Sequence, residues 1–232
     1  MPQSPSTALI LGASRGLGLA LAAEYLKRGW RVIATVRGSK KGDLHALAAK
    51  ADGRLEIETV DIDVPEQVAA LRKRLDGRSL DLLFVNAGVT NDKHQPVGQV
   101  PTEEFVRLMV TNALSPMRVI EGFESLVPPT GTIGVMSSGL GSVADNDRGG
   151  WEVYRASKAA LNTLMRSFAA RHAGDPRAMV IIAPGWVRTD MGGAEATLGI
   201  EDSIPKVVDT ITRRTGKPGL SYLNYLGETV RW

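Results

Sequence analysis

Tyr154 and Lys158 stand four residues apart, a spacing that places both side chains on one face of a helix. A free tyrosine has a pKa of about 10 and is a poor base at neutral pH. A neighbouring ammonium stabilises the phenolate, and lowering the pKa by about 3 units requires roughly 4 kcal/mol of differential stabilisation. The pair is therefore a candidate general acid and base for interconverting a carbonyl group and an alcohol. Taken alone, the same spacing arises frequently by chance.

Two further polar residues are candidates for the site: Ser138 stands at a predicted sheet edge, and Asn112 stands within a predicted apolar helix face. Ser138 follows the predicted strand 132–136, at the carboxyl edge where ligands bind in doubly wound sheets, and its hydroxyl is placed to hydrogen-bond a substrate oxygen. Strand alternation turns its neighbour Ser137 the other way. Asn112 stands in the apolar stripe of a predicted helix, where an amide costs free energy unless it is bonded. It either belongs to the site or caps a backbone kink.

A glycine-rich turn, residues 12–18, joins the first predicted strand to the first predicted helix. Backbone N–H groups at a helix N-terminus bind a pyrophosphate, and a Cβ at these glycines would block its approach or the helix–sheet contact. A plain tight turn is the alternative, but the position after a strand and before a helix favours a dinucleotide site. The residues expected to bind the cofactor here are Gly12, Ser14, Arg15, Gly16, Leu17 and Gly18.

The end of the second predicted strand indicates which dinucleotide binds. An NAD site usually has Asp or Glu there, about 20 residues after the glycines, to hold the ribose hydroxyls. This strand ends in Val36-Arg37, with no carboxylate. Arg37 and Arg15 present two guanidiniums and no competing anion, which favours the 2′-phosphate of NADP(H) over NAD(H). Each arginine is alternatively an ordinary solvated side chain.

Short apolar runs alternate with helix-like segments along the chain, and these elements must position the residues above. Strands are predicted at 7–11, 31–36, 55–60, 80–85, 132–136, 179–183 and 222–225, and helices at 16–28, 43–51, 65–75, 103–126 and 154–172. The alternation implies βαβ crossovers, hence an α/β fold with a mostly parallel seven-stranded sheet, doubly wound, with helices on both faces. Because no linker or repeat divides it, the chain is predicted to be one domain, 1–232, with substrate loops at 139–153 and 186–205.

Composition narrows the classes of partner. The 232 residues include 28 Lys and Arg against 25 Asp and Glu, and the basic residues are scattered, so no nucleic-acid partner is predicted. There is no cysteine, and the three histidines lie far apart, so no metal is predicted. No apolar run approaches the roughly 20 residues that cross a bilayer, and residues 1–6 lack a signal-peptide pattern. We therefore expect a cytoplasmic protein with no membrane partner.

Further motifs follow in an order that resembles the short-chain dehydrogenase/reductase family, in its Tyr-x-x-x-Lys type. The glycine turn has the family's Gly-x-x-x-Gly-x-Gly spacing, and residues 86–88 (Asn-Ala-Gly) are similar to its Asn-Asn-Ala-Gly, with Val85 in place of the first Asn. Residues 184–189 resemble its Pro-Gly-x-[Val/Ile]-x-Thr segment. The start of the loop after Ser138, its length and the tail at 223–225 look most like the C-factor-like subgroup.

The resemblance implies a Rossmann fold and a role for each matching residue. It implies that Ser138, Tyr154, Lys158 and Asn112 are catalytic, with Asn112 supporting a water-mediated proton relay from the lysine to solvent. It also implies that Thr189 meets the nicotinamide carboxamide, which would present one face of the ring for hydride transfer. The cofactor-binding residues that it adds are Asp61, Ile62, Asn86, Ala87, Gly88, Tyr154, Lys158, Pro184, Gly185, Val187 and Thr189.

Two functions fit these features. The first is an NADPH-dependent carbonyl reductase, reversible as an alcohol dehydrogenase, that acts on a small carbonyl or alcohol with Tyr154 as general acid and base. The second is a non-catalytic NADP(H)-binding regulatory or signalling protein on the same scaffold. The complete set of four catalytic residues favours the enzyme. The resemblance further implies a homodimer or homotetramer formed through the helices 103–126 and 154–172.

The loop between Ser138 and Tyr154 departs from the family pattern, because the two residues are 16 apart, a few more than is common. We expect the added residues, 145–148, to bulge outward beside the substrate mouth. Trp151, Trp186 and Met191 indicate an apolar side to the pocket, although a tryptophan more often serves packing. A terminal Trp232, if exposed, would fit a subunit contact.

Overall fold

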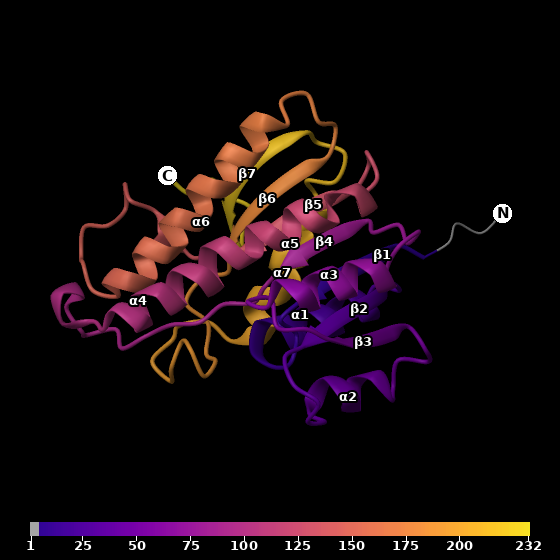
Figure 1. The fold of residues 1–232 in the computed structure, drawn as a ribbon, viewed down its shortest axis with the longest axis horizontal. Helices are drawn as coiled ribbons and strands as arrows, with labels where there is room; N and C mark the ends of the chain where they lie inside the picture. The colour runs from indigo at the N-terminus through magenta and orange to yellow at the C-terminus, as the bar shows by residue number, and fades with distance from the viewer. Residues whose placement is uncertain (1–4) are drawn as a thin grey trace.

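The computed structural model describes residues 5–232, which form one seven-stranded sheet flanked by helices (Figure 1). Residues 1–4, part of the stretch without a signal-peptide pattern, lie outside the described residues. The strands are β1 Thr7–Leu11, β2 Arg31–Val36, β3 Leu55–Thr59, β4 Leu82–Val85, β5 Thr132–Met136, β6 Ala178–Ala183 and β7 Gly219–Asn224. All neighbours pair in parallel, in the order β3-β2-β1-β4-β5-β6-β7. The predicted parallel, doubly wound sheet is confirmed.

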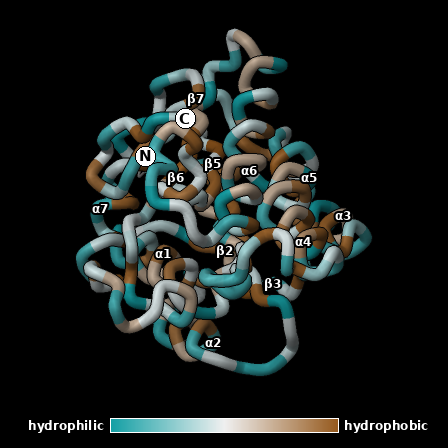
Figure 2. The backbone as a smooth tube through the Cα atoms, turned by 90° about the vertical axis from the view of Figure 1, so that its left-hand side faces the viewer, coloured by the Kyte–Doolittle hydropathy of each residue, from teal (hydrophilic) through white to brown (hydrophobic). Residues whose placement is uncertain are grey.

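Helices cover both faces of this sheet (Figure 2). One layer contains α1 Gly16–Lys27, α2 Asp43–Ala48 and α7 Ile200–Thr212; the other contains α3 Pro65–Arg74, α4 Thr102–Met109, α5 Ser115–Phe123 and α6 Glu152–Arg171. The chain winds outward from β1 through β2 to β3 and then crosses back to β4 on the other side of β1. This reversal lies between β1 and β4, and ligands of such sheets bind there, beyond the carboxyl ends of the strands.

The core consists of two large apolar clusters, one on each face of the sheet, and a small third one that contains Tyr154. Strands β1, β4, β5 and β6 are buried over almost their whole length, because helices cover them on both sides. Gly134 in β5 shows how closely the sheet is packed: a Cβ there would lie 2.7 Å from the ring of Phe84 and 2.8 Å from the side chain of Val180. The strands that carry the candidate site therefore form a rigid platform.

The helix predicted at 103–126 is present, but it is not a regular α-helix throughout. It consists of α4, a wide π-helical turn η2 at Val110–Leu114, α5, and a short 3-10 turn η3 at Glu124–Leu126. Pro116, four residues after Asn112, has no N–H to donate to the Asn112 carbonyl, so the regular helical hydrogen bond cannot form there. The interruption falls on a residue predicted for the site, and such turns occur frequently at functional sites.

Helix α7 is the second difference, since residues 186–205 were expected to be irregular. The helix begins at Ile200, after Gly199, whose N–H donates to the Asp202 carboxylate. Pro205 stands inside it, and because proline usually ends a helix, the sequence pattern does not predict one here. The buried face of α7, which includes Val207 and Val208, packs on the sheet and outweighs the hydrogen bond lost at the proline.

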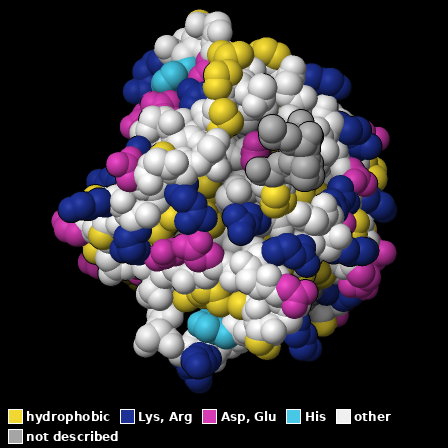
Figure 3. All heavy atoms as spheres, turned by 90° about the vertical axis from the view of Figure 1, so that its right-hand side faces the viewer, with side chains coloured by type: hydrophobic (Ala, Val, Ile, Leu, Met, Phe, Trp, Pro, Cys, Tyr) yellow, Lys and Arg dark blue, Asp and Glu magenta, His cyan; other side chains and the backbone are white. Residues whose placement is uncertain are grey.

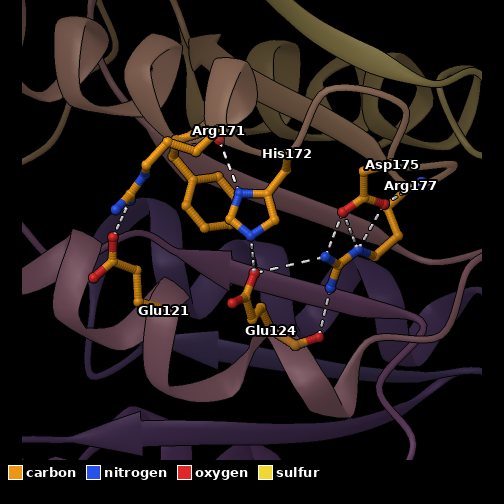
Figure 4. A network of polar contacts seen from close by, with 7 residues as sticks. Glu121, Glu124, Arg171, His172, Asp175 and Arg177 are labelled. Carbon is orange, nitrogen blue, oxygen red and sulfur yellow. Dashed lines mark hydrogen bonds and ion pairs between the residues drawn. The ribbon is translucent and has the colours of Figure 1, made fainter.

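The connection from α6 to β6 is held by charged side chains at the amino-terminal end of β6 (Figure 4). Arg177 donates to the Asp175 carboxylate and to the Glu124 carbonyl, joining this connection to the end of η3. Burial works against its charge, but the Asp175 carboxylate keeps the pKa of Arg177 above its usual value. His172 extends the network, with Nε2 3.1 Å from Glu124.

The surface carries both signs of charge. On the face drawn in Figure 3, Lys and Arg are interspersed with Asp and Glu, and no continuous basic patch forms there. Within residues 5–232, no helix has the length and apolarity needed to cross a bilayer. Over the same residues, no group of three His, Asp or Glu side chains converges as a metal site would.

Candidate active site

The glycine turn packs directly against the residues that follow β4. Gly12 has a φ of +86°, and a Cβ on it would lie 2.7 Å from the backbone of Ala87. A Cβ on Gly18 would lie 2.1 Å from the Gly12 carbonyl oxygen, so side chains are excluded at both positions. Asn86 donates from Nδ2 to that same carbonyl at 2.7 Å. The structure thus brings together two predicted cofactor motifs, with Asn86 supporting the turn.

The first turn of α1 is open. Arg15, the residue that precedes the helix, makes no side-chain cap, and the first turn contains no acidic residue. Gly16 has a φ of +56°, and the nearest atom to a Cβ placed on it is the Thr189 methyl group, at 3.8 Å. There is therefore room beside Gly16, on the side that Thr189 borders. An uncapped helix N-terminus of this kind attracts anions.

The two predicted 2′-phosphate ligands differ in their surroundings. Arg15 forms an ion pair with Asp190, and both side chains are mostly exposed. The expectation that no anion competes for the two guanidiniums is therefore wrong for Arg15, because the loop that contains Asp190 folds over the start of α1. Arg37 follows β2, is exposed, and has no ion-pair partner within residues 5–232.

Asp61 and Ile62 lie just beyond β3, near the same carboxyl edge. Ile62 is buried in the core cluster that includes Val60. The Asp61 carboxylate accepts the Asp63 N–H at 3.0 Å, while the Asp61 N–H donates to Gln67. The turn after β3 is thus fixed by its own side chains, and only Asp61 of the predicted pair keeps accessible surface.

Tyr154 lies in the first turn of α6 with its side chain almost fully buried. The Ser138 side chain, at the end of β5, is close enough to influence its phenol. Burial raises the pKa of Tyr154 to about 12, and the polar side chain of Ser138 partly opposes that rise. Without the nucleotide, loss of water from the phenol dominates, and the Lys158 ammonium lies 5.9 Å from the ring centroid. A lowered pKa, produced by Lys158 together with a positively charged nicotinamide, stays a prediction.

Lys158 is a buried ammonium with one protein acceptor. Its Nζ donates to the Met136 carbonyl at 3.0 Å, and burial lowers its pKa to about 8. Gly88 stands between this ammonium and Asn112, since a Cβ on it would lie 3.3 Å from both Lys158 Nζ and Asn112 Oδ1. The four predicted catalytic residues, Ser138, Tyr154, Lys158 and Asn112, therefore gather at the carboxyl ends of β4 and β5.

Asn112 is fully buried within η2, and its amide is completely bonded. It accepts the Val89 N–H at 2.8 Å, donates to the Val89 carbonyl at 2.8 Å and donates to Ser157 Oγ at 2.9 Å. Its side chain thus fixes the chain after β4, while its own carbonyl is the one that Pro116 cannot cap. The amide therefore does not cap the backbone of its own helix, and a role for Asn112 in the site stays a prediction.

The two serines at the end of β5 face different surroundings. Ser137 is buried and donates to Asn162 Oδ1 on α6 at 2.7 Å. Ser138 accepts the Leu140 N–H at 3.1 Å through its hydroxyl, and its carbonyl accepts the Tyr222 hydroxyl at 2.5 Å. Sequence reasoning missed Asn162 and Tyr222, and polar residues inside buried elements were the available signal.

Thr35 is a further missed residue. It is buried near the end of β2, and its hydroxyl accepts the Gly12 N–H at 3.0 Å. Its carbonyl accepts the Ala13 N–H at 2.8 Å. These two bonds fix the start of the glycine turn.

The segment after β6 borders the site from the other side. The Pro184 carbonyl accepts the Ser203 hydroxyl at 2.7 Å, and Gly185 has a φ of +85°. Val187 is buried and pairs as an isolated bridge with Leu198. The Thr189 hydroxyl accepts the N–H of residue 192 at 3.1 Å, which closes the loop over the start of α1.

The long loop before α6 is exposed from residue 143 to residue 150, as expected for an outward bulge. Its base is tied to the end of the chain. Asp145 forms an ion pair with Arg231, and the Ala144 N–H donates to the Trp232 carbonyl at 2.9 Å. The Trp232 ring lies 5.6 Å from the Tyr222 ring, so this side chain packs on its own protein rather than projecting freely.

Known proteins are similar to this chain in sequence and in fold. Residues 6–197 match the family model described as short chain dehydrogenase. A short-chain dehydrogenase/reductase of Burkholderia multivorans, solved with bound NADP, is 60% identical, with a TM-score of 0.97 over 99% of this chain and 100% of that one. A carbonyl reductase of Pseudomonas aeruginosa PAO1 in complex with NADP is 35% identical, with a TM-score of 0.92 over 99% and 100% of the two chains. The C-signal protein of Myxococcus xanthus is 34% identical over 66% of this chain and 93% of its own.

Proposed function

This chain belongs to the short-chain dehydrogenase/reductase family, and from that premise we propose that it is an NADPH-dependent carbonyl reductase, reversible as an alcohol dehydrogenase. The similar Burkholderia and Pseudomonas proteins, both crystallised with NADP, support the cofactor. The observation that carries the proposal is the convergence of Ser138, Tyr154 and the Lys158 ammonium at one sheet edge, with Lys158 Nζ 5.9 Å from the centroid of the Tyr154 ring. These groups suit the polarisation and protonation of a carbonyl oxygen.

The residues present fit NADP(H). The uncapped first turn of α1 suits a pyrophosphate, and Arg37, which has no acidic partner among residues 5–232, suits the 2′-phosphate. Lys158 has three donors but only the Met136 carbonyl as a protein acceptor, which leaves donors for ribose hydroxyls. Thr189 borders the glycine turn and is proposed to hold the carboxamide. When bound, the nicotinamide supplies or accepts the hydride.

The chain's own residues are proposed to manage the proton. Ser138 hydrogen-bonds the substrate oxygen, and Tyr154 donates its hydroxyl proton to that oxygen during reduction. A cation beside the phenolate offsets the cost of charging a buried tyrosine, which Lys158 provides while it is protonated. Asn112 holds the loop after β4, and we propose that a water-mediated relay beside it connects the lysine to solvent.

Tyr154→Phe tests this proposal, because it removes the proton donor and keeps the ring. With NADPH and a panel of aldehydes and ketones, the variant should lose turnover by about 10²–10⁴-fold. Its dissociation constant for NADPH, measured by nucleotide fluorescence, should stay within about twofold of the unmodified protein. Turnover that survives the substitution would show that the proton donor is another group.

A second function, a non-catalytic NADP(H)-binding signalling protein, is supported by the similarity to the C-signal protein. The two functions differ in one measurement on the unmodified protein. Tight NADPH binding without oxidation of NADPH by any carbonyl compound in the panel would favour the signalling function. The complete set of Ser138, Tyr154, Lys158 and Asn112 favours the enzyme. On either function, we propose that the segments 139–153 and 186–199 border the ligand site.

A further inference from the structure

The chain enters α6 through three consecutive residues in the left-handed region. Gly149, Gly150 and Trp151 have φ values of +62°, +67° and +55°. Glycine adopts this conformation freely, whereas for a bulky residue such as tryptophan it is a rare and costly one. Backbone strain of this kind persists only where the surroundings enforce it, and it is concentrated at functional sites.

Arg155 is the residue that holds the turn. Its Nε donates to the Gly150 carbonyl at 2.9 Å, and a terminal nitrogen donates to the Gly149 carbonyl at 3.2 Å. The Trp151 N–H donates to the Lys93 carbonyl at 3.0 Å, and the Trp151 carbonyl accepts the Arg155 N–H at 2.8 Å. The strained tryptophan is therefore fixed on both sides by hydrogen bonds.

The strain places the Trp151 indole against the proposed proton donor. Its ring centroid lies 5.8 Å from that of Tyr154, with the planes at 59°. The indole is only half-buried, and it packs with Leu140, Val89 and Val100 on the small apolar cluster that contains Tyr154. The surroundings of the phenol ring on this side are thus aromatic and aliphatic.

We propose that Trp151 is the aromatic wall of the substrate site, with Arg155 as its positioning residue, so that the enzyme favours carbonyl compounds that carry a flat apolar substituent. The inference rests on the proposed function, because it places the substrate carbonyl at Tyr154. A flat ring beside that carbonyl stacks on the accessible indole face, which an aliphatic chain of similar size does less well.

Binding of two ketones to the protein–NADP⁺ complex tests the wall without any turnover, since the oxidised cofactor cannot reduce a ketone. Titration calorimetry with acetophenone and with 2-octanone, an aliphatic methyl ketone that also has eight carbons, should give a preference of about 2- to 10-fold for acetophenone. Trp151→Ala should abolish this preference. Trp30→Ala, at a tryptophan that packs on Tyr25 away from α6, should keep it.

Further variants distinguish the role of the Trp151 indole from that of Arg155, which holds it in place. Trp151→Gly fits the left-handed backbone without strain, so it should fold at least as stably as Trp151→Ala and still lose the preference. Arg155→Met removes both carbonyl bonds and should reduce the preference, whereas Arg155→Lys, which keeps a charged donor, should restore part of it. A purely structural role for Arg155 would change the melting temperature and leave the ratio of the two dissociation constants unchanged.

Equal affinities for the two ketones in the unmodified complex would overturn the inference, as would a preference that persists in Trp151→Gly. The proposed function fails independently of these results. If NADPH is not oxidised with any carbonyl compound while acetophenone is still preferred and Trp151 is required, the aromatic wall stands and the reductase activity does not.

Discussion

At the scale of single residues, Lys158 is the most unusual group in the protein. It is an ammonium with almost no exposed surface, and no carboxylate is among the causes that shift its pKa. Burial alone lowers the pKa from 10.5 to about 8. Such a cation destabilises the folded protein until it finds partners, which is the expected condition of a group reserved for a ligand.

The pH dependence of stability should reveal this ammonium. The unfolded chain holds the Lys158 proton up to a pKa of 10.5, while the folded protein releases it near 8. The unfolded state thus binds more protons between these values, so the free energy of unfolding rises with pH, by about 1.4 kcal/mol per pH unit from this group. Urea unfolding at pH 8 and pH 9.5 should show a gain that Lys158→Met lacks. Parallel curves for the two proteins would contradict the buried charge.

Cofactor discrimination should depend on Arg37 more than on Arg15. Because Arg15 is paired with Asp190, it must leave that carboxylate to meet a 2′-phosphate, whereas Arg37 is available. Arg37→Ala should reduce the NADPH preference over NADH by about tenfold or more, and Arg15→Ala by less. Asp190→Asn should increase it. Dissociation constants from nucleotide fluorescence measure all four proteins, and equal affinities for the two cofactors in the unmodified protein would refute the role of both arginines.

At the scale of elements, strands were more predictable than helices. The bounds of β1, β2 and β5 follow directly from apolar runs, because strands covered on both faces leave little doubt about where burial ends. The long helix 103–126 has continuous helical spacing, so its break at η2 depends on one missing N–H at Pro116. Helix α7 was not predicted because proline usually ends a helix, and Pro205 stands inside it. Tertiary packing offsets the free-energy cost of this proline, and the local sequence pattern does not indicate that packing.

The candidate site was predictable to the same degree. Motif residues such as Tyr154 and Lys158 could be found by spacing, because a helical face is a local property. Their support could not, since Tyr222 reaches Ser138 across 84 positions and Trp151 depends on hydrogen bonds to Arg155 and to the Lys93 carbonyl. The upward shift of the Tyr154 pKa could not be predicted from the sequence either, because it depends on burial.

The contact from β7 to the end of β5 should matter for activity. Tyr222 donates its hydroxyl to the Ser138 carbonyl, whereas the buried hydroxyl of Tyr25 has no hydrogen-bond partner within residues 5–232. Tyr222→Phe should lower the free energy of unfolding by about 1 kcal/mol and reduce kcat, with KM for NADPH unchanged. The matched variant Tyr25→Phe should leave kcat unchanged and be neutral or slightly stabilising. Similar kcat values for Tyr222→Phe and the unmodified protein would show that this bond is only structural.

At the scale of the whole molecule, the two edges of the sheet differ. The candidate site occupies the carboxyl ends of the strands. Two surface hollows of about 490 and 430 Å³ lie instead against residues 172–177, before the amino end of β6, beside the charged network of Figure 4. Both arginines labelled in that network face an acid, so the charged groups at this edge stabilise the protein's own structure.

Self-association is expected through the layer that contains α4, η2 and α6. This layer exposes several apolar side chains, among them Val106, Leu114 and Leu164. Sedimentation should therefore show a dimer or tetramer, and Leu164→Glu should shift it toward the monomer because it places a charge in the contact. Val143→Glu alters a more exposed apolar residue on the loop before α6 and should leave the sedimentation coefficient unchanged. A monomeric unmodified protein would contradict the expected assembly.

The ion pair between Arg15 and Asp190 joins the first helix to the loop after β6 where the pyrophosphate and nicotinamide are proposed to lie. At 0.15 M ionic strength, the Debye length is about 8 Å, so dissolved ions weaken this exposed attachment as well as the attraction between arginine and phosphate. Added salt therefore has two opposing effects. It releases the Arg15 guanidinium from Asp190 so that it can bind the nucleotide, and it weakens the long-range attraction between the arginines and the nucleotide phosphates. The affinity for NADPH should consequently fall less steeply with rising salt concentration than the number of cations proposed to bind its phosphates would predict.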